Sequence, residues 1–155
     1  MLLSAGLKVV TAESCTGGGV AAALTDVPGS SQWFERGYVT YSNAAKLQDL
    51  HIAPSALERH GAVSAGVVEQ MVAGALRASG ADVAVAVSGI AGPDGGTADK
   101  PVGLVFLAAA RRGGAVRVLR EQFPGDRAAV RRAAVAAALR LIVQAATSAT
   151  FGARN

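Results

Sequence analysis

The stretch of sequence that most constrains the fold is a glycine-rich segment, TAESCTGGG, at residues 11–19. A largely apolar run at residues 7–10 precedes it, and small apolar residues at 20–24 follow it. This pattern predicts a strand, a tight turn and a helix, with the glycines where the helix begins. Strand–turn–helix units of this kind are typical of α/β proteins.

The rest of the chain continues the alternation of strands and helices. We expect strands at residues 8–11, 37–41, 82–87, 102–109 and 115–123, and helices at 17–25, 43–50, 54–59, 64–79 and 126–142. The connection at residues 111–114 is too short for a parallel crossover, so the last two strands should form an antiparallel hairpin. This order predicts the α/β class: an α/β/α sandwich on a mixed, mostly parallel sheet.

Length and composition favour one domain over residues 1–155. The chain is 51% hydrophobic, but no uncharged apolar run approaches the roughly 20 residues that span a bilayer, so we expect no membrane partner. No basic residues precede the apolar start of the chain, so we do not expect a signal peptide. The single cysteine, Cys15, is typical of a reducing, cytoplasmic compartment.

Charge raises the question of a nucleic-acid partner, because the formal net charge is +4 and the arginines are concentrated after residue 110. No aromatic residues interleave them, and no nucleic-acid-binding motif is present. We therefore interpret the arginines as a solvated face and do not expect nucleic acid. Two histidines and one cysteine make no zinc ligand set, and we predict neither a metal nor a cofactor.

Two glycine-rich loops, at residues 14–19 and 88–97, each follow a predicted strand. Ligands of α/β sheets collect at the carboxyl ends of strands, which predicts one site built from both loops. The N–H groups at the start of a helix attract a phosphate or an oxyanion. A simple glycine-rich connection, with Ser14 or Thr16 as an N-cap, is the alternative for the first loop.

Possible nucleophiles are Ser14, Cys15, Ser31 and Ser88, and no histidine lies in these loops to serve as a base. Lys46 is placed near the start of a predicted helix, where the dipole disfavours its charge. If it is also buried, its neutral amine could accept a serine proton, with Tyr41 to hold or relay it. The alternatives are an exposed helix lysine and a tyrosine that packs on the core.

Several segments, in the right order along nearly the whole chain, resemble the CinA C-terminal domain family. They are TAESCTGG at residues 11–18, GSSQWF at 29–34, TYSNAAK at 40–46, GAVS at 61–64, VSGIAGPDGG at 87–96 and KPVG at 100–103. The resemblance implies a three-layer α/β/α domain with a five-stranded mixed sheet. It also implies that an additional N-terminal domain is absent and that an N-terminal helix is shortened or missing.

The activity that this resemblance implies is metal-free hydrolysis of nicotinamide mononucleotide to nicotinate mononucleotide and ammonia, in pyridine-nucleotide salvage. The family is regarded as using a Ser/Lys pair, which points to Ser14 and Ser31 with Tyr41 and Lys46 as catalytic residues. Family members commonly assemble as dimers or higher homo-oligomers. The residues expected to bind the substrate are Thr16, Gly17, Gly18, Ser88, Gly89, Ala91, Gly92, Gly95, Gly96 and Arg127.

Two assignments of this site remain open. In the first, which we slightly prefer, the helix start at residues 16–18 binds the phosphate with Arg127, and Ser31 is the nucleophile with Lys46 as base. In the second, Ser14 attacks and the loop at residues 91–96 takes the phosphate. A non-catalytic interaction module linked to competence and recombination is the alternative function.

Overall fold

The computed structural model describes residues 1–148 and 151, and its central feature is a five-stranded sheet in the order β2-β1-β3-β4-β5. The strands are β1 (Val9–Glu13), β2 (Phe34–Val39), β3 (Val83–Gly89), β4 (Leu104–Arg111) and β5 (Arg117–Gln122). The helices are α1 (Gly19–Thr25), α2 (Asn43–Leu50), α3 (Pro54–His60), α4 (Ala65–Arg77) and α5 (Arg127–Thr147), with short 3-10 turns η1 (Leu3–Ala5) and η2 (Ser30–Gln32).

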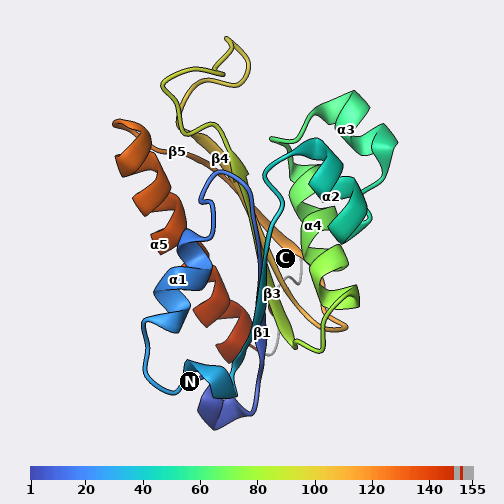
Figure 1. The fold of residues 1–155 in the computed structure, drawn as a ribbon, viewed down its shortest axis with the longest axis vertical. Coiled ribbons are helices and arrows are strands. Elements are labelled where there is room, and N and C mark those ends of the chain that lie inside the picture. The colour runs from blue at the N-terminus through green and yellow to red at the C-terminus, as the bar shows by residue number, and fades with distance from the viewer. Residues whose placement is uncertain (149–150, 152–155) are drawn as a thin grey trace.

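Helices cover both faces of the sheet, which confirms the predicted α/β/α sandwich. Figure 1 shows α1 and α5 on one face and α2, α3 and α4 on the other. The two faces of β1 divide the core accordingly: Val9 packs with the cluster that contains α1 and α5, and Val10 and Ala12 pack with the cluster that contains α4. The central strands β1 and β3 are almost fully buried, as expected for strands covered on both sides.

The sheet is mixed, as expected, but it is less parallel than the sequence suggested. β1 pairs in parallel with β2 and β3, whereas β4 pairs antiparallel with both β3 and β5. The predicted hairpin of the last two strands is therefore confirmed. The same hairpin places β4 between β3 and β5, which makes two of the four strand pairings antiparallel.

Several element boundaries differ from those expected. β2 begins at Phe34 rather than at residue 37, because the bond from the Val9 N–H to the Trp33 carbonyl already aligns this segment with β1. β1 extends to Glu13, and α1 begins only at Gly19 because Gly17 and Gly18 adopt positive φ in the turn before it.

The topology brings three connections to one edge of the sheet. Because β1, β2 and β3 are parallel, their carboxyl ends lie together, and the segments at residues 14–18, 40–42 and 90–103 leave from that edge. In Figure 1 this edge is at the top, where the last of these segments extends beyond the helices. The edge at which the sequence predicted one site from two loops is therefore the edge at which they meet.

Candidate active site

A cavity of about 280 Å³ lies at this edge, between the loops that follow β1, β2 and β3. Its lining combines residues from both glycine-rich loops with residues of α2 and of the start of α5. The lining residues are Ser14, Cys15, Tyr41, Lys46, Ala62, Val63, Ser88, Gly89, Ile90, Ala91, Gly92, Asp94, Gly95 and Arg127.

Lys46 reaches the cavity from the first turn of α2. Ser42 caps this helix by accepting a hydrogen bond from the Ala45 N–H. The Lys46 side chain is only 1% exposed, and its Nζ lies 3.1 Å from Ser14 Oγ and donates to the Thr40 carbonyl oxygen at 2.7 Å. Burial lowers the pKa of Lys46 below its usual value, with a smaller opposing effect from Cys15. Low pKa favours the neutral amine, which is the form that can accept a proton.

Ser14 follows the last residue of β1 and lies at the floor of the turn. Its N–H donates to the Val87 carbonyl of β3, and its own carbonyl accepts from the Gly17 N–H. These two bonds fix the backbone on both sides of the Ser14 side chain. The turn therefore presents the hydroxyl to Lys46 from a buried and well-supported position.

Ser31, which the sequence analysis slightly preferred as the nucleophile, does not meet Lys46. It is exposed within η2, which leads into the start of β2. The carbonyl of Trp33, directly after η2, accepts from the Val9 N–H at the start of β1. Ser14 comes five residues after Val9, which places it about 16 Å from the start of β1 at the rise per residue of a β-strand. The structure therefore brings Ser14, not Ser31, to the lysine, whereas the choice of nucleophile stays a prediction.

The start of α1, expected to bind phosphate through Thr16, Gly17 and Gly18, is already occupied by a side chain of the protein. The carboxylate of Glu13 accepts hydrogen bonds from the Val20 and Ala21 N–H groups, at 3.0 and 2.8 Å. It also accepts from the Thr16 hydroxyl at 2.7 Å. None of the three expected residues lines the cavity. The sequence analysis missed Glu13, although an acidic residue beside a helix start is a recognisable capping signal.

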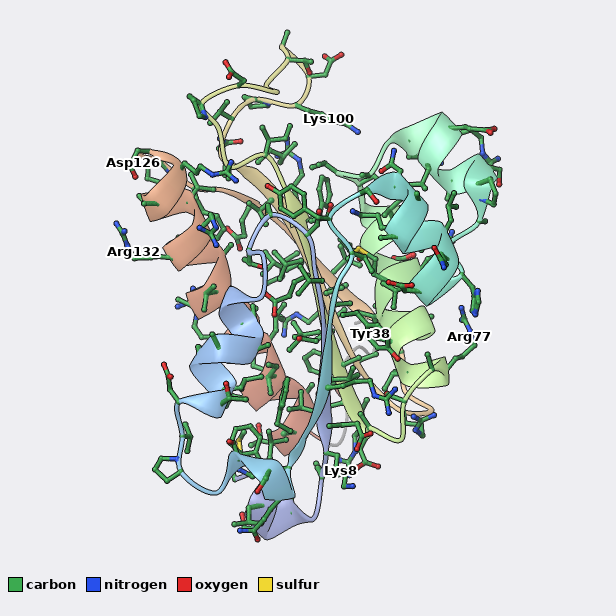
Figure 2. The ribbon with its side chains drawn as sticks, viewed as in Figure 1. Lys8, Tyr38, Arg77, Lys100, Asp126 and Arg132 are labelled. Atoms are coloured by element: carbon green, nitrogen blue, oxygen red, sulfur yellow. The ribbon has the colours of Figure 1, made fainter. Side chains whose placement is uncertain are left out.

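Arg127 lines the opposite side of the cavity, at the first position of α5. Its Nη1 donates to the Gly92 carbonyl at 2.9 Å, and its Nη2 donates to the Tyr41 hydroxyl at 3.0 Å. Within the described residues, no hydrogen bond joins the Tyr41 hydroxyl to Ser14 or Lys46. Tyr41 therefore contacts the arginine rather than the Ser14–Lys46 pair. Asp126, labelled in Figure 2, caps the same helix.

The second glycine-rich loop forms the remaining wall. Ser88, Gly89, Ala91, Gly92 and Gly95 line the cavity as expected. Gly96 does not line it, and a Cβ there would press on Val102.

The base of this loop is tied to the neighbouring segment that precedes α4. The Ser88 hydroxyl donates to the Ala62 carbonyl at 2.9 Å. Lys100 Nζ donates to the His60 carbonyl, and Figure 2 shows this lysine reaching across from the loop toward α3. The lining residues Ala62, Val63, Ile90 and Asp94 were not predicted individually, although all lie in quoted motifs.

Cys15 also lines the cavity, but its environment opposes a role as nucleophile. Burial raises the pKa of its thiol to about 11, against smaller lowering effects that include Arg131 and Lys46. The thiol therefore remains protonated near neutral pH, whereas the thiolate is the reactive form.

Two kinds of feature are absent from the described part of the chain, residues 1–148 and 151. Those residues contain no group of three or more His, Cys, Asp or Glu side chains that could hold a metal ion. They also contain no helix long and apolar enough to cross a membrane.

Comparisons with known proteins find similar sequences and similar structures. The family model of the CinA C-terminal domain matches residues 1–146. Proteins named nicotinamide-nucleotide amidohydrolase PncC are 56% identical in Escherichia coli K12, over 92% of this chain and 87% of the relative, and 59% identical in Pseudomonas putida, over 90% and 87%. The crystal structure of the competence/damage inducible protein CihA from Agrobacterium tumefaciens is 48% identical, with a TM-score of 0.90 over 92% of this chain and 87% of that one.

Proposed function

This chain belongs to the CinA C-terminal domain family, and from that premise we propose that it is an amidohydrolase that converts nicotinamide mononucleotide and water to nicotinate mononucleotide and ammonia. The observation that carries the proposal is the buried contact of 3.1 Å between Lys46 Nζ and Ser14 Oγ at the cavity. The names of the PncC relatives support the substrate. Competence-related names also occur among the similar proteins, but a role as a non-catalytic interaction module leaves this contact without a purpose.

In the proposed first step, Ser14 Oγ attacks the carboxamide carbon while the neutral Lys46 amine takes the serine proton. The carbonyl oxygen becomes an oxyanion that needs hydrogen-bond donors. The N–H group of Cys15, which lines the cavity, is a candidate, because it donates to no backbone carbonyl within the described residues. The lysine then gives its proton to the leaving nitrogen, and ammonia departs as the C–N bond breaks.

In the second step, water attacks the resulting acyl-enzyme ester. Lys46 takes a proton from the water, the ester bond to Ser14 Oγ breaks, and the serine recovers its proton from the lysine. The products are the free carboxylic acid and the original enzyme. A base with a lowered pKa suits both steps, because burial favours the neutral amine that accepts the proton and weakens its hold on the proton that it must later release.

The other end of the substrate carries a phosphate, for which we propose Arg127 and the loop at residues 91–95. A guanidinium has five N–H donors, and Arg127 uses two of its nitrogens on Gly92 and Tyr41 while holding its charge at the cavity wall. Gly92 and Gly95 adopt positive φ, which allows the backbone of this loop to approach a ligand closely. This proposal takes the loop from the second of the two assignments left open by the sequence and adds Arg127 from the first. We propose that Tyr41 orients the arginine.

The proposal is tested by measuring ammonia and nicotinate mononucleotide released from nicotinamide mononucleotide, beside the same measurement on nicotinamide riboside, which lacks the phosphate. We expect equimolar products from the mononucleotide and a KM for the riboside at least about tenfold higher, because a charge-assisted contact is lost. Arg127→Ala should raise KM for the mononucleotide but not for the riboside. Arg132→Ala, an exposed position on the same helix that points away from the sheet in Figure 2, is the matched control.

A folded protein that releases no ammonia from nicotinamide mononucleotide would contradict the proposal. Equal KM values for the two substrates would contradict the phosphate assignment alone. Metal independence and homo-oligomerisation stay predictions of the family resemblance, and cytoplasmic location stays a prediction from the single cysteine. Activity after dialysis against a chelator would test metal independence.

A further inference from the structure

Glu13 is a fully buried acidic residue directly before Ser14, and the proposed mechanism does not use it. Its backbone is held in the sheet between β2 and β3, opposite Val39 and Val87. Its carbonyl accepts from the Thr40 N–H, and Thr40 in turn supplies the carbonyl that binds Lys46. The main chain of Glu13 therefore connects directly to the surroundings of both members of the Ser14–Lys46 pair.

The side chain of Glu13 turns toward the start of α1, where its carboxylate accepts three hydrogen bonds. Oε2 accepts from the Thr16 hydroxyl and the Val20 N–H, and Oε1 accepts from the Ala21 N–H. Within residues 1–148 and 151, it forms no ion pair. Two backbone donors at the start of α1 and one hydroxyl thus take the place of a cation.

These hydrogen bonds join the two ends of the short segment that contains Ser14, the residue whose position matters most for the proposed reaction. Residues 14–18 run from the end of β1 to α1: the turn begins directly after the backbone of Glu13, and the start of α1 at its other end is bonded to the Glu13 side chain. Apart from Glu13, the turn is held by the Ser14 N–H to Val87 bond, by Arg131 Nη2, which donates to the Thr16 carbonyl at 2.9 Å, and by bonds within itself, such as Gly17 N–H to the Ser14 carbonyl.

We infer that Glu13 is the positioning residue of this site: its carboxylate holds the turn so that Ser14 Oγ meets Lys46 Nζ. This inference rests on the proposed function only for its kinetic consequence. A displacement of about 1 Å between reacting groups can cost about 100-fold in rate, so loss of this support should appear mainly in kcat.

Glu13→Gln is a nearly isosteric test. A glutamine has one oxygen that accepts and one NH₂ group that only donates. If the oxygen faces Val20, the NH₂ group faces the Ala21 N–H, and if it faces Ala21, the NH₂ group faces the Val20 N–H. In either orientation one buried backbone donor of α1 loses its acceptor, and the turn must shift. Glu69→Gln, at an exposed position of α4, is the matched control.

The experiment compares crystal structures and steady-state kinetics of the wild type, Glu13→Gln and Glu69→Gln, after thermal unfolding has established that each is folded. For Glu13→Gln we expect the distance from Ser14 Oγ to Lys46 Nζ to exceed hydrogen-bond range. We expect kcat on nicotinamide mononucleotide to fall by about 10- to 100-fold, KM to stay within about threefold, and the pH midpoint of kcat to be unchanged. Glu69→Gln should match the wild type.

An unchanged distance in Glu13→Gln, or a kcat within twofold of the wild type, would overturn the positioning role. If Glu13→Gln does not fold, Thr16→Val removes one donor and leaves the carboxylate in place. It should lower kcat by about fivefold without changing KM, and an unaltered kcat there would equally overturn the inference. A wild type that releases no ammonia would contradict the proposed function. The distance from Ser14 Oγ to Lys46 Nζ in the crystal structures would still decide the role of Glu13.

Discussion

At the scale of single residues, the site depends on removing one lysine from water. Lys46 lies at the fourth position of α2 and is 1% exposed, so both the helix dipole and desolvation oppose its charge. The side chain meets two partners, the Ser14 hydroxyl and the Thr40 carbonyl. A neutral amine can donate to the Thr40 carbonyl and accept from the Ser14 hydroxyl, so these two contacts suit the uncharged form of Lys46.

The lowered pKa of Lys46 predicts the direction of the pH dependence. Only the neutral amine can take the serine proton, so kcat should rise as the pH increases through the pKa of Lys46 and then reach a plateau. The midpoint should lie below 10.5, the usual lysine value, because burial lowers the pKa. A pH–rate profile of the wild type checks this, and Lys46→Arg, which stays charged, should show neither the rise nor appreciable activity. A midpoint at or above 10.5 would contradict the account.

At the scale of secondary-structure elements, α2 is held where its lysine is useful by close contact with α4. Gly74 of α4 is buried, and a Cβ at this position would overlap the carbonyl oxygen of Leu50, the last residue of α2. The absence of a side chain thus lets the two helices approach. On the other side of the sheet, α1 is short and depends on Glu13 to satisfy its first N–H groups.

Gly74→Ala should therefore destabilise the protein by about 1–3 kcal/mol, the usual cost of overpacking, although alanine is the better helix former. Because α2 would be displaced, kcat should fall as well. Gly66→Ala on the same helix is the control: no atom lies within 4 Å of its Cβ, and it should stabilise by about 0.5–1 kcal/mol. Denaturant unfolding of the two variants measures both effects. A Gly74→Ala protein as stable as Gly66→Ala would show that this contact is not tight.

The elements also show where sequence reasoning succeeds and where it stops. The strand–turn–helix unit and the final hairpin follow from local patterns, and both are confirmed. The start of α1 was expected to bind phosphate because its N–H groups lack partners within the helix. Sequence could not show that the side chain of Glu13 turns back onto them, since this depends on the geometry of the turn at residues 14–18.

At the scale of the whole molecule, the site exists only because the topology brings distant segments together. Ser14 and Lys46 are 32 residues apart, and Arg127 and Tyr41 are 86 apart. All four residues could be identified from the sequence, but the slight preference there was to pair Lys46 with Ser31, whereas the structure places Ser14 beside the lysine. Ser31 follows α1 and precedes β2, so it lies at the edge where β1 and β2 begin rather than where they end. The parallel pairing of β1 and β2 is what places Ser14 and Ser31 at opposite edges of the sheet.

The most direct test of the central claim is ammonia release from nicotinamide mononucleotide by two single variants, Ser14→Ala and Ser31→Ala, measured beside the wild type. We predict that Ser14→Ala lowers kcat by at least about 1,000-fold, as expected for loss of a nucleophile, while its unfolding temperature stays close to that of the wild type. Ser31→Ala, which removes an exposed hydroxyl far from Lys46, should keep kcat within about twofold. Full activity in Ser14→Ala, or loss of activity confined to Ser31→Ala, would contradict the account.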